Sequence, residues 1–370
     1  VDTWLANQLL SNISSNTKLL IVGDADQLPS VSPGQVLSDL LQIPSIPQVK
    51  LEHVFRQSED STIVTLASQI RKGHLPPDFM EKKPDRSYFE APSELVAPMI
   101  EKITSAALRN GIPARDIQVL APMYRGSAGI DQINSLMQEL LNPLETDALF
   151  FQALDCQYRN GDKVIHLVND AESNVFNGDI GYITDLLPAK YTESKQDELT
   201  IQFDGNELVY PRNEWYKIRL AYAMSIHKSQ GSEFPVVILP LTNQSRRMLQ
   251  RNLIYTAITR SKSKLILLGE YTAFHFATQN TGTARKTYLI ERFSDVLPQR
   301  TDSSSQSPVH LEELDKKTEP QSELVSVENH SDSSDSQHSQ QGYRLTKDNY
   351  LSIDPMIGLT EEEIQEFFKN

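Results

Sequence analysis

The chain has 370 residues, of which 39% are hydrophobic, a net charge of −14 and one cysteine, Cys156. These values exclude a small disulfide-bonded domain and favour a globular protein of two or three domains. A single cysteine forms no internal disulfide, which favours a reducing cytoplasm, and no Cys/His cluster has zinc-ligand spacing. No apolar run approaches the ~20 residues of a membrane helix, so we expect no membrane association.

The negative charge is concentrated at the end of the chain. Residues 300–370 contain 15 acidic and 6 basic side chains, so nine of the 14 excess negative charges lie there. The total charge argues against a uniformly basic nucleic-acid coat. The nearly balanced remainder of the chain is compatible with a local basic groove.

Alternating strand and helix patterns fill most of the chain before residue 300. Apolar runs bounded by turn residues predict buried strands at KLLIVGD (18–24), IQVLAPM (117–123), PVVILP (235–240) and KLILLG (264–269). Helical periodicity predicts helices at 62–71, 93–110, 129–141 and 248–261. Strands separated by helices imply an α/β domain, a parallel sheet with helices on both faces.

Residues 158–216 have a different pattern. GDKVIHLVND, NGDIGYITDLL, ELTIQFDG and NELVYPRNEW are short alternating runs separated by Asn-Gly and Asp-Gly turns. They predict a small all-β unit inserted into the α/β domain, because the strand-helix pattern resumes after it.

The end of the chain has the composition of a linker followed by a short peptide. Residues 301–342 are rich in Ser, Asp and Gln and poor in aromatic residues, which predicts disorder. Beyond them, Thr360 and Glu363 have capping-box spacing before Ile364, Phe367 and Phe368. The peptide is either a docking helix for a protein partner or a tail helix without one.

Three polar clusters follow predicted strands or helices, where ligands of open α/β sheets gather. The first is GDADQLPSVSPG (23–34), in which Asp24, Asp26 and Gln27 suit water, phosphate or metal contacts, or form an ordinary Asx turn. Asp24 as a Walker B magnesium ligand would need a GxxxxGK[ST] phosphate loop, which this sequence lacks. The second is HVFRQ (53–57), whose Arg56 binds phosphate or is a surface arginine at a helix start.

The third cluster combines SIHKSQGSEF (225–234) with YTAITR (255–260). Arg260 lies near a helix end, where it acts as an arginine finger on a phosphoryl group or as a cation favoured by the helix dipole. The polar run at 225–234 stands directly before the apolar run PVVILP. Its polar side chains are costly to bury unpaired, so we expect them to be used or hydrogen-bonded.

The order of these clusters resembles that of the superfamily-one DNA helicases, most closely the RecD-like, 5′-to-3′ branch, the group of the exodeoxyribonuclease V alpha subunit. GDADQLPSVSPG is similar to their third motif, HVFRQ to the fourth, SIHKSQGSEF to the fifth and YTAITR to the sixth. APMYRGSAGIDQIN (121–134) is similar to their DNA-facing segment. The resemblance covers about residues 1–295. It implies a RecA-like, P-loop-NTPase-type sheet with an inserted Src-homology-like β-barrel and a disordered C-terminal tail.

The resemblance also implies roles for individual residues. Gln27 corresponds to the sensor of the γ-phosphate, and Arg56 and Arg260 to the two arginines that embrace it. The residues implied near the nucleotide are Asp24, Asp26, Gln27, Arg56, Gly231, Glu233 and Arg260. Those implied at single-stranded DNA are Pro122, Met123, Tyr124, Ser225, His227 and Lys228. Gly231 is expected to permit a tight turn, and the Tyr124 ring to stack on a base or sugar.

The expected domains follow from the same resemblance. Residues 1–50 end a first RecA-like motor domain; 51–157 and 217–298 form the second, interrupted by the barrel at 158–216; 299–342 form the linker and 343–370 the C-terminal peptide. The implied cofactors are ATP and Mg²⁺, and the implied partners are single-stranded DNA and single-strand/double-strand junctions. The phosphate loop and the DE motif of the family are absent from this sequence. We therefore expect the C-terminal part of a longer repair or recombination helicase, inactive as an ATPase by itself.

One alternative is a non-catalytic DNA-binding or regulatory module with the same fold. An upstream reading frame with a phosphate loop and a DE motif would favour the motor. A conjugative relaxase would require tyrosine and His-triad chemistry that the sequence lacks. The helicase subunit of an exonuclease complex would require partner subunits, and no carboxylate cluster suggests a nuclease in this chain.

Overall fold

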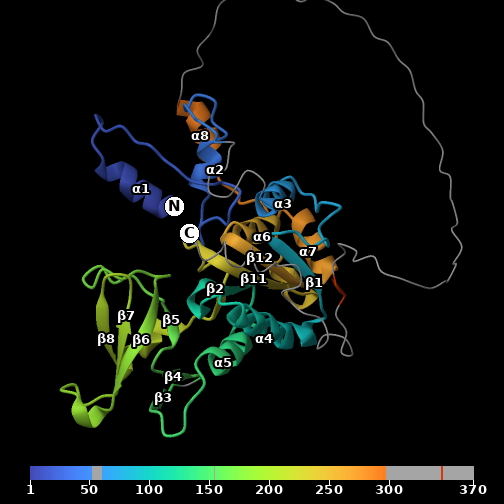
Figure 1. The fold of residues 1–370 in the computed structure, drawn as a ribbon. Coiled ribbons are helices and arrows are strands. Elements are labelled where there is room, and N and C mark those ends of the chain that lie inside the picture. Colours follow the sequence, from blue (N-terminus) through green and yellow to red (C-terminus); the bar gives the residue numbers. More distant parts are fainter. Residues whose placement is uncertain (52–60, 154, 297–342, 345–370) are drawn as a thin grey trace, which may run out of the picture.

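A six-stranded parallel sheet lies at the centre of the protein, whose computed structural model describes residues 1–51, 61–153, 155–296 and 343–344 (Figure 1). The strands run in the order β10 (Ala223–Ser225), β2 (Ile117–Ala121), β11 (Phe234–Leu241), β12 (Ser261–Gly269), β1 (Arg86–Glu90) and β13 (Tyr343–Arg344). Three of the four predicted buried strands are confirmed as β2, β11 and β12.

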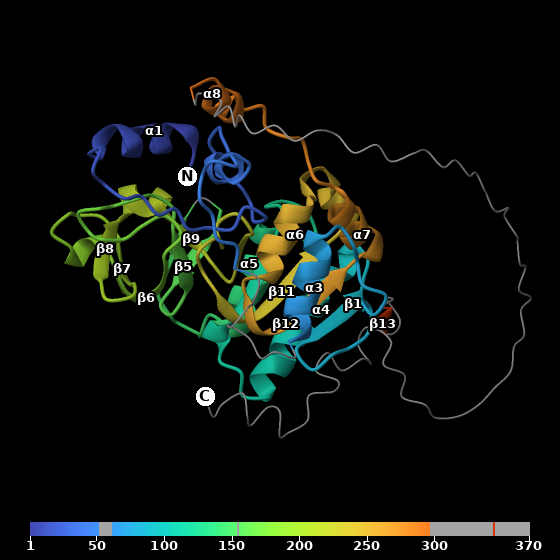
Figure 2. The ribbon, with the colours of Figure 1, turned by 90° about the horizontal axis from the view of Figure 1, so that it is seen from above.

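Helices cover both faces of the sheet, as the sequence predicts. Helices α4 (Ser93–Arg109) and α5 (Ile130–Leu141) pack on one face; α3 (Thr62–Arg71), α6 (Arg251–Ile258) and α7 (Tyr271–Gln279) pack on the other (Figures 1 and 2). In β11, Val236 and Ile238 belong to the hydrophobic core between the sheet and helices α4 and α5. Val237 and Leu239 belong to the core between the sheet and helices α3, α6 and α7. Because both faces are buried, this strand reads as a continuous apolar run.

The predicted helix boundaries agree closely for α3, α4 and α5. Helix α6 is shorter than the predicted range 248–261. Residues Asn243–Met248 form 3₁₀ turns before it, and Ser261 already belongs to β12.

An inserted β-domain, defined here as residues 163–220, stands beside the parallel sheet (Figure 1). Its five antiparallel strands run in the order β8 (Glu207–Pro211), β7 (Glu198–Gln202), β6 (Ile180–Leu187), β5 (Lys163–His166) and β9 (Ile218–Leu220). A two-stranded ribbon, β3 (Phe150–Gln152) with β4 (Gln157–Arg159), precedes it. Gly178 and Gly205 have φ values of 108° and 82°, which suit the Asn-Gly and Asp-Gly turns seen in the sequence.

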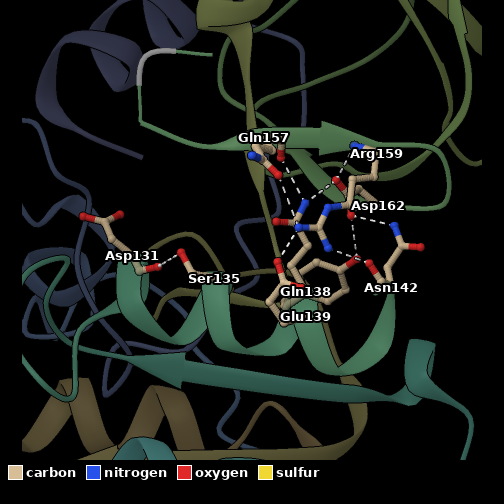
Figure 3. A network of polar contacts seen from close by, with 9 residues as sticks. Asp131, Ser135, Gln138, Glu139, Asn142, Gln157, Arg159 and Asp162 are labelled. Atoms are coloured by element: carbon tan, nitrogen blue, oxygen red, sulfur yellow. Dashed lines mark hydrogen bonds and ion pairs between the residues drawn. The ribbon is translucent and has the colours of Figure 1, made fainter. Parts of the chain in front are cut away.

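A buried carboxylate, Asp162, lies directly before the inserted β-domain. Asp162 has no solvent exposure and accepts hydrogen bonds from Gln138 Nε2 (2.6 Å), Asn142 Nδ2 (2.8 Å), the Tyr222 hydroxyl (3.0 Å) and the Arg159 backbone N–H (2.7 Å). Figure 3 shows α5 presenting its side chains to Asp162 and the neighbouring strand. Burial raises the pKa of the Asp162 carboxyl.

A buried lysine and a buried arginine add to this junction. Lys163 is 3% exposed and donates to the backbone carbonyls of Arg115 (3.3 Å) and Ile117 (3.4 Å), at the start of β2. Arg159 donates to the Asn142 carbonyl (2.9 Å) and pairs with Glu139 of α5 (Figure 3). These contacts hold the inserted β-domain against α5 and β2.

The predicted strand at 18–24 is wrong. Residues 18–22 belong to no strand, and Leu20 and Val22 are 85% and 82% exposed. A strand needs a neighbour for its backbone N–H and C=O groups, and no strand among the described residues lies beside this segment. The segment is apolar, but no strand in the described part of the chain pairs with it.

Two N-terminal helices flank this segment. Helix α1 (Thr3–Asn12) projects on the side of the inserted β-domain, and α2 (Val36–Leu40) packs against α8 (Leu289–Val296) (Figures 1 and 2). Asp2 caps α1 by accepting from the Leu5 backbone N–H at 2.7 Å.

The predicted linker at 299–342 and the C-terminal helix lie outside the described residues, except that Tyr343–Arg344 pairs in parallel with β1. Within the described ranges, no helix combines the length and the apolar character that a membrane crossing requires.

Candidate functional site

Gln27 and Arg260 meet just before the start of β12. Arg260 follows α6, is 5% exposed and donates from Nη2 to Gln27 Oε1 at 3.1 Å. The same guanidinium donates from Nε to the Thr256 carbonyl and from Nη1 to the Ser232 carbonyl, both at 3.1 Å. Gln27 in turn donates from Nε2 to Asp24 Oδ2 at 3.0 Å. The first and third polar clusters of the sequence therefore form one hydrogen-bonded site.

The backbone of Leu28 is hydrogen-bonded to two elements of this site. Its N–H donates to Thr256 Oγ1 at 2.8 Å, and its carbonyl accepts from Gln230 Nε2 at 2.7 Å. Thr256 comes from α6 and Gln230 from the loop at 226–233. Gln230 lies within the run SIHKSQGSEF but had no predicted role.

Asp24 and Asp26 have different surroundings. Asp24 accepts from the Asp26 backbone N–H at 3.0 Å, which is an Asx-type turn. Burial and the nearby Asp24 carboxylate raise the pKa of Tyr255 to about 12. Asp26 is half exposed and lies 3.8 Å from Arg71 Nη1 of α3.

Several polar side chains of the loop at 226–233 are hydrogen-bonded or ion-paired. It is a series of turns between β10 and β11. Gly231 has φ of 87° there, so the predicted need for a flexible residue is confirmed. Glu233 lies 3.8 Å from Lys262 Nζ, and the Lys228 ammonium donates to Asn177 Oδ1 at 2.9 Å.

Ser225 is buried, whereas His227 and Lys228 are both half-buried. Ser225 is 7% exposed at the end of β10, and its carbonyl accepts from the Lys228 backbone N–H at 3.0 Å. His227 is half-buried, and burial lowers its pKa.

The segment that we expect to face DNA begins with a turn between β2 and α5. Pro122 is buried and Met123 half-buried, whereas Tyr124 is 41% exposed. The carbonyls of Met123 and Tyr124 accept from the backbone N–H groups of Ile130 (3.0 Å) and Asp131 (3.1 Å). This arrangement folds the turn onto the start of α5 and leaves the Tyr124 ring at the surface.

Arg285 is a site residue that sequence reasoning missed. It donates from Nη1 to the carbonyls of Ser32 (2.9 Å) and Gly34 (2.7 Å), and from Nη2 to that of Ser30 (2.7 Å). These bonds tie the loop after Gln27 to the segment between α7 and α8. No motif surrounds Arg285, so the sequence carried no signal for this contact.

Arg56 and the rest of HVFRQ lie outside the described residues. Among the described residues, no three His, Cys, Asp or Glu side chains lie together as a metal site would require.

Three known families match parts of the chain. Residues 1–91 match the family described as an AAA domain, residues 133–203 an ATP-dependent RecD-like DNA helicase SH3 domain, and residues 220–268 a UvrD-like helicase C-terminal domain.

Curated relatives extend this similarity across most of the chain. It is 32% identical over 290 residues to an ATP-dependent RecD2 DNA helicase of Deinococcus radiodurans, an alignment that covers 77% of this chain and 37% of that protein. It is 28% identical over 291 residues to the RecBCD enzyme subunit RecD of Mycolicibacterium smegmatis, covering 73% and 48%. The chain thus spans less than half the length of these two relatives.

A solved structure of a Pif1 helicase from Bacteroides in complex with ADP-AlF3 and ssDNA is also similar. The identity is 18%, the match covers 74% of this chain and 65% of that one, and the TM-score is 0.42.

Proposed function

Because the chain belongs to the RecD-like group of superfamily-one helicases, we propose that it supplies the ATP-sensing and DNA-gripping part of an ATP-dependent DNA helicase. The observation that carries this proposal is the hydrogen bond between Gln27 and Arg260. It joins a glutamine and an arginine that lie 233 positions apart in the sequence and that the family resemblance assigns to the same phosphate.

The proposed domain division follows the sequence expectation. Residues 1–50 would close a first motor domain, 51–157 and 217–298 would form the second, and the inserted β-domain would interrupt it. The greater length of the relatives supports a further region that carries the phosphate loop and magnesium ligands.

Arg260 suits contact with the terminal phosphate of ATP. It donates hydrogen bonds to the carbonyls of Thr256 and Ser232, to the Gln27 amide oxygen and to the Thr259 hydroxyl, and these bonds orient the guanidinium. A bound ATP would supply the phosphoryl group whose transfer Arg260 stabilises. Arg56 is proposed as the second arginine on the same phosphate, and Asp24, Asp26, Gly231 and Glu233 as the surrounding residues.

Gln27 would connect the nucleotide to the DNA contacts. Its neighbour Leu28 is bonded to Gln230, which lies in the same short loop as His227 and Lys228. A change at Gln27 would therefore reach the loop at 226–233 through the hydrogen bond between Leu28 and Gln230. Pro122, Met123, Tyr124, Ser225, His227 and Lys228 are proposed to face single-stranded DNA, with 5′-to-3′ translocation during repair or recombination in the cytoplasm. Single-strand/double-strand junctions would be the substrate for unwinding, and the C-terminal peptide would dock on a protein partner.

The test compares the 370-residue chain with the chain extended upstream through its reading frame. We expect DNA-stimulated ATP hydrolysis in the extended protein alone, and a loss of about 10³-fold or more in Arg260→Ala. Arg247→Ala, an exposed arginine just before α6, is the matched control. ATP hydrolysis by the 370-residue chain that Arg260→Ala abolishes would overturn the proposed division of labour. Unchanged hydrolysis in Arg260→Ala of the extended protein would overturn the role of the site.

A further inference from the structure

The segment after α7 crosses from one part of the protein to another. It is anchored first at the start of α6, where the Asn280 carbonyl accepts from the Arg251 backbone N–H at 2.8 Å and Asn280 Nδ2 donates to the Leu249 carbonyl at 2.7 Å. Five positions later, Arg285 donates to three backbone carbonyls of the loop at 30–34, at 2.7 to 2.9 Å. Helix α8 follows and packs on α2. Both ends of this crossing are therefore fixed.

Helix α8 lies with α2, away from the helices that cover the parallel sheet, in both views of the fold (Figures 1 and 2). Its apolar side chains Leu289, Ile290 and Phe293 are half-buried, whereas Glu291 and Arg292 are exposed. One-sided burial of this kind is typical of a helix that packs on a neighbour through an apolar stripe. In the proposed domain division α2 belongs to the first motor domain. Helix α8 thus rests on the domain opposite the one that the chain has just left.

The loop that Arg285 contacts is itself attached to α1. The Thr3 backbone N–H donates to the Pro33 carbonyl at 3.1 Å. Gly34 is buried with φ of 110°, and a Cβ there would come within 2.1 Å of Thr3 Oγ1. Arg285 and α8 therefore contact one connected region, which runs from α1 through this loop to α2.

The crossing itself is short. Residues 281–284 are exposed or half-exposed, and Gly282 has φ of 73°. The five steps of chain from Asn280 to Arg285 span at most about 18 Å when fully extended. Because both ends are anchored, this length limits how far the two regions can separate at this place.

We propose that residues 281–296 form a strap between the two motor domains, in which residues 285–296 move with the first domain and the crossing at 281–284 limits the opening of the nucleotide site. The proposal rests on the helicase function and the domain division proposed above, and it adds a conformational control to them. The hydrogen bond between Gln27 and Arg260 joins the same two domains. That contact opens and closes with the nucleotide, whereas the strap stays attached throughout.

A limit on opening affects how tightly ATP is held. Closure of the two domains around ATP completes the site, and the apparent affinity falls as the binding-competent state becomes less populated. A strap that excludes widely open states raises the population of states close to closure. It therefore lowers the KM for ATP. It leaves kcat largely unchanged, because Arg285 contacts the loop after Gln27 rather than the Gln27–Arg260 pair.

The first test measures distances by energy transfer between fluorescent labels in the upstream-extended protein. Pairs of labels are placed through Arg292→Cys on α8, Gln42→Cys after α2 and His275→Cys on α7, all exposed positions, in a Cys156→Ser background. On addition of ADP-aluminium fluoride with Mg²⁺, we expect the distance between positions 42 and 292 to stay constant. The distances from position 275 to both of them should change together.

The second test lengthens the crossing without removing a contact. Six Gly/Ser residues inserted after Thr283 extend its reach by up to about 20 Å. We expect the KM for ATP to rise about fivefold or more, the lower end of typical coupling between sites, without a fall in kcat. The matched control is the same insertion after Gly205, in an exposed turn of the inserted β-domain with open space around it. Thermal unfolding of each variant shows whether it is folded.

The outcomes separate the strap from the helicase function. If the nucleotide changes the distance between positions 42 and 275 while position 292 keeps its distance from 275, the strap is overturned and the two-domain motor stands. A KM that the insertion after Thr283 leaves at the wild-type value would overturn the limit on opening. An extended protein that neither hydrolyses ATP nor changes any of these distances would overturn both proposals.

Discussion

The Gln27 amide oxygen accepts a hydrogen bond from Arg260 Nη2 at 3.1 Å, and the Gln27 amide nitrogen donates to Asp24. Gln27 thus bridges the Asp24 carboxylate and the buried Arg260 guanidinium. Its amide oxygen is one of the acceptors that orient this guanidinium. Any movement of the segment at 23–29 is transmitted to Arg260 through this contact.

Gln27→Ala is expected to lower kcat for ATP hydrolysis in the upstream-extended protein. A hydrogen bond to a charged group contributes about 1.5–3 kcal/mol, which corresponds to roughly a 10- to 100-fold loss of rate. Steady-state hydrolysis at saturating DNA measures the effect. Gln42→Ala, an exposed glutamine after α2, is the control. A normal kcat in Gln27→Ala would show that Arg260 is oriented without it.

Arg285→Ala is expected to loosen the loop that follows Gln27. Three backbone carbonyls lose their donor at once, so local opening of residues 28–36 should become more frequent. Limited proteolysis or hydrogen exchange of this segment measures it, with an expected acceleration of about tenfold, the equivalent of 1.4 kcal/mol. Lys286→Ala, the exposed neighbour, should behave as wild type. Equal exchange in both variants would contradict the role of Arg285.

Asp162→Ala is expected to destabilise the junction of the inserted β-domain. Four donors lose their shared acceptor in a site without solvent. Removing one partner from such a buried network costs about 3 kcal/mol or more. Urea unfolding measures this change, and Asp204→Ala at an exposed turn is the matched control. Asp162→Asn retains one acceptor oxygen and should fall between them. A loss below 1 kcal/mol in Asp162→Ala would be inconsistent with the network as described.

Lys163 predicts a pH dependence of stability. Burial lowers its pKa from 10.5 to about 8 in the folded protein. Between these values the unfolded chain binds more protons than the folded one, so this lysine's contribution makes the free energy of unfolding rise with pH from about 8 to 10.5. The cost of the buried charge, on the order of 3 kcal/mol, is fully present below pH 8.

Lys163→Met removes this titration. The stability of the variant relative to wild type should therefore be greatest near pH 7 and decline as the pH rises to about 9.5. Chemical denaturation at several pH values measures the difference, and the subtraction cancels the buried tyrosines, which titrate in both proteins. A difference that is independent of pH would contradict the depressed pKa.

Much of the fold could be predicted because the local pattern and the tertiary environment agree. The helix at 62–71 was predicted to the residue, since Ile63, Leu66 and Ile70 recur at helical spacing and all three are buried. Strands β2, β11 and β12 were found because burial on both faces leaves an uninterrupted apolar run.

The failures have physical reasons as well. The apolar segment at 18–22 has the composition of a buried strand, but pairing depends on neighbours that local sequence does not specify. Strand β1, RSYFE, begins with the buried Arg86, whose charge conceals it from an apolar-run search. It was therefore missed although its side chains lie in the core.

Some residues of the candidate site could likewise be predicted from the sequence, and others could not. Gln27 and Arg260 could be chosen from motif order, and the structure brings them together. Asn177 and Arg285 have no motif around them, because each makes its contact only when distant segments of the chain fold together. The contacts of such residues can be identified only in the folded structure.

The row of apolar side chains from Leu19 to Val22 has a practical consequence. It pairs with none of the described strands, and its side chains are between 43% and 85% exposed. Such a segment is a template for strand addition between molecules. We therefore expect the 370-residue chain to self-associate in solution as its concentration rises, and a lysine in place of Leu20 to keep it monodisperse.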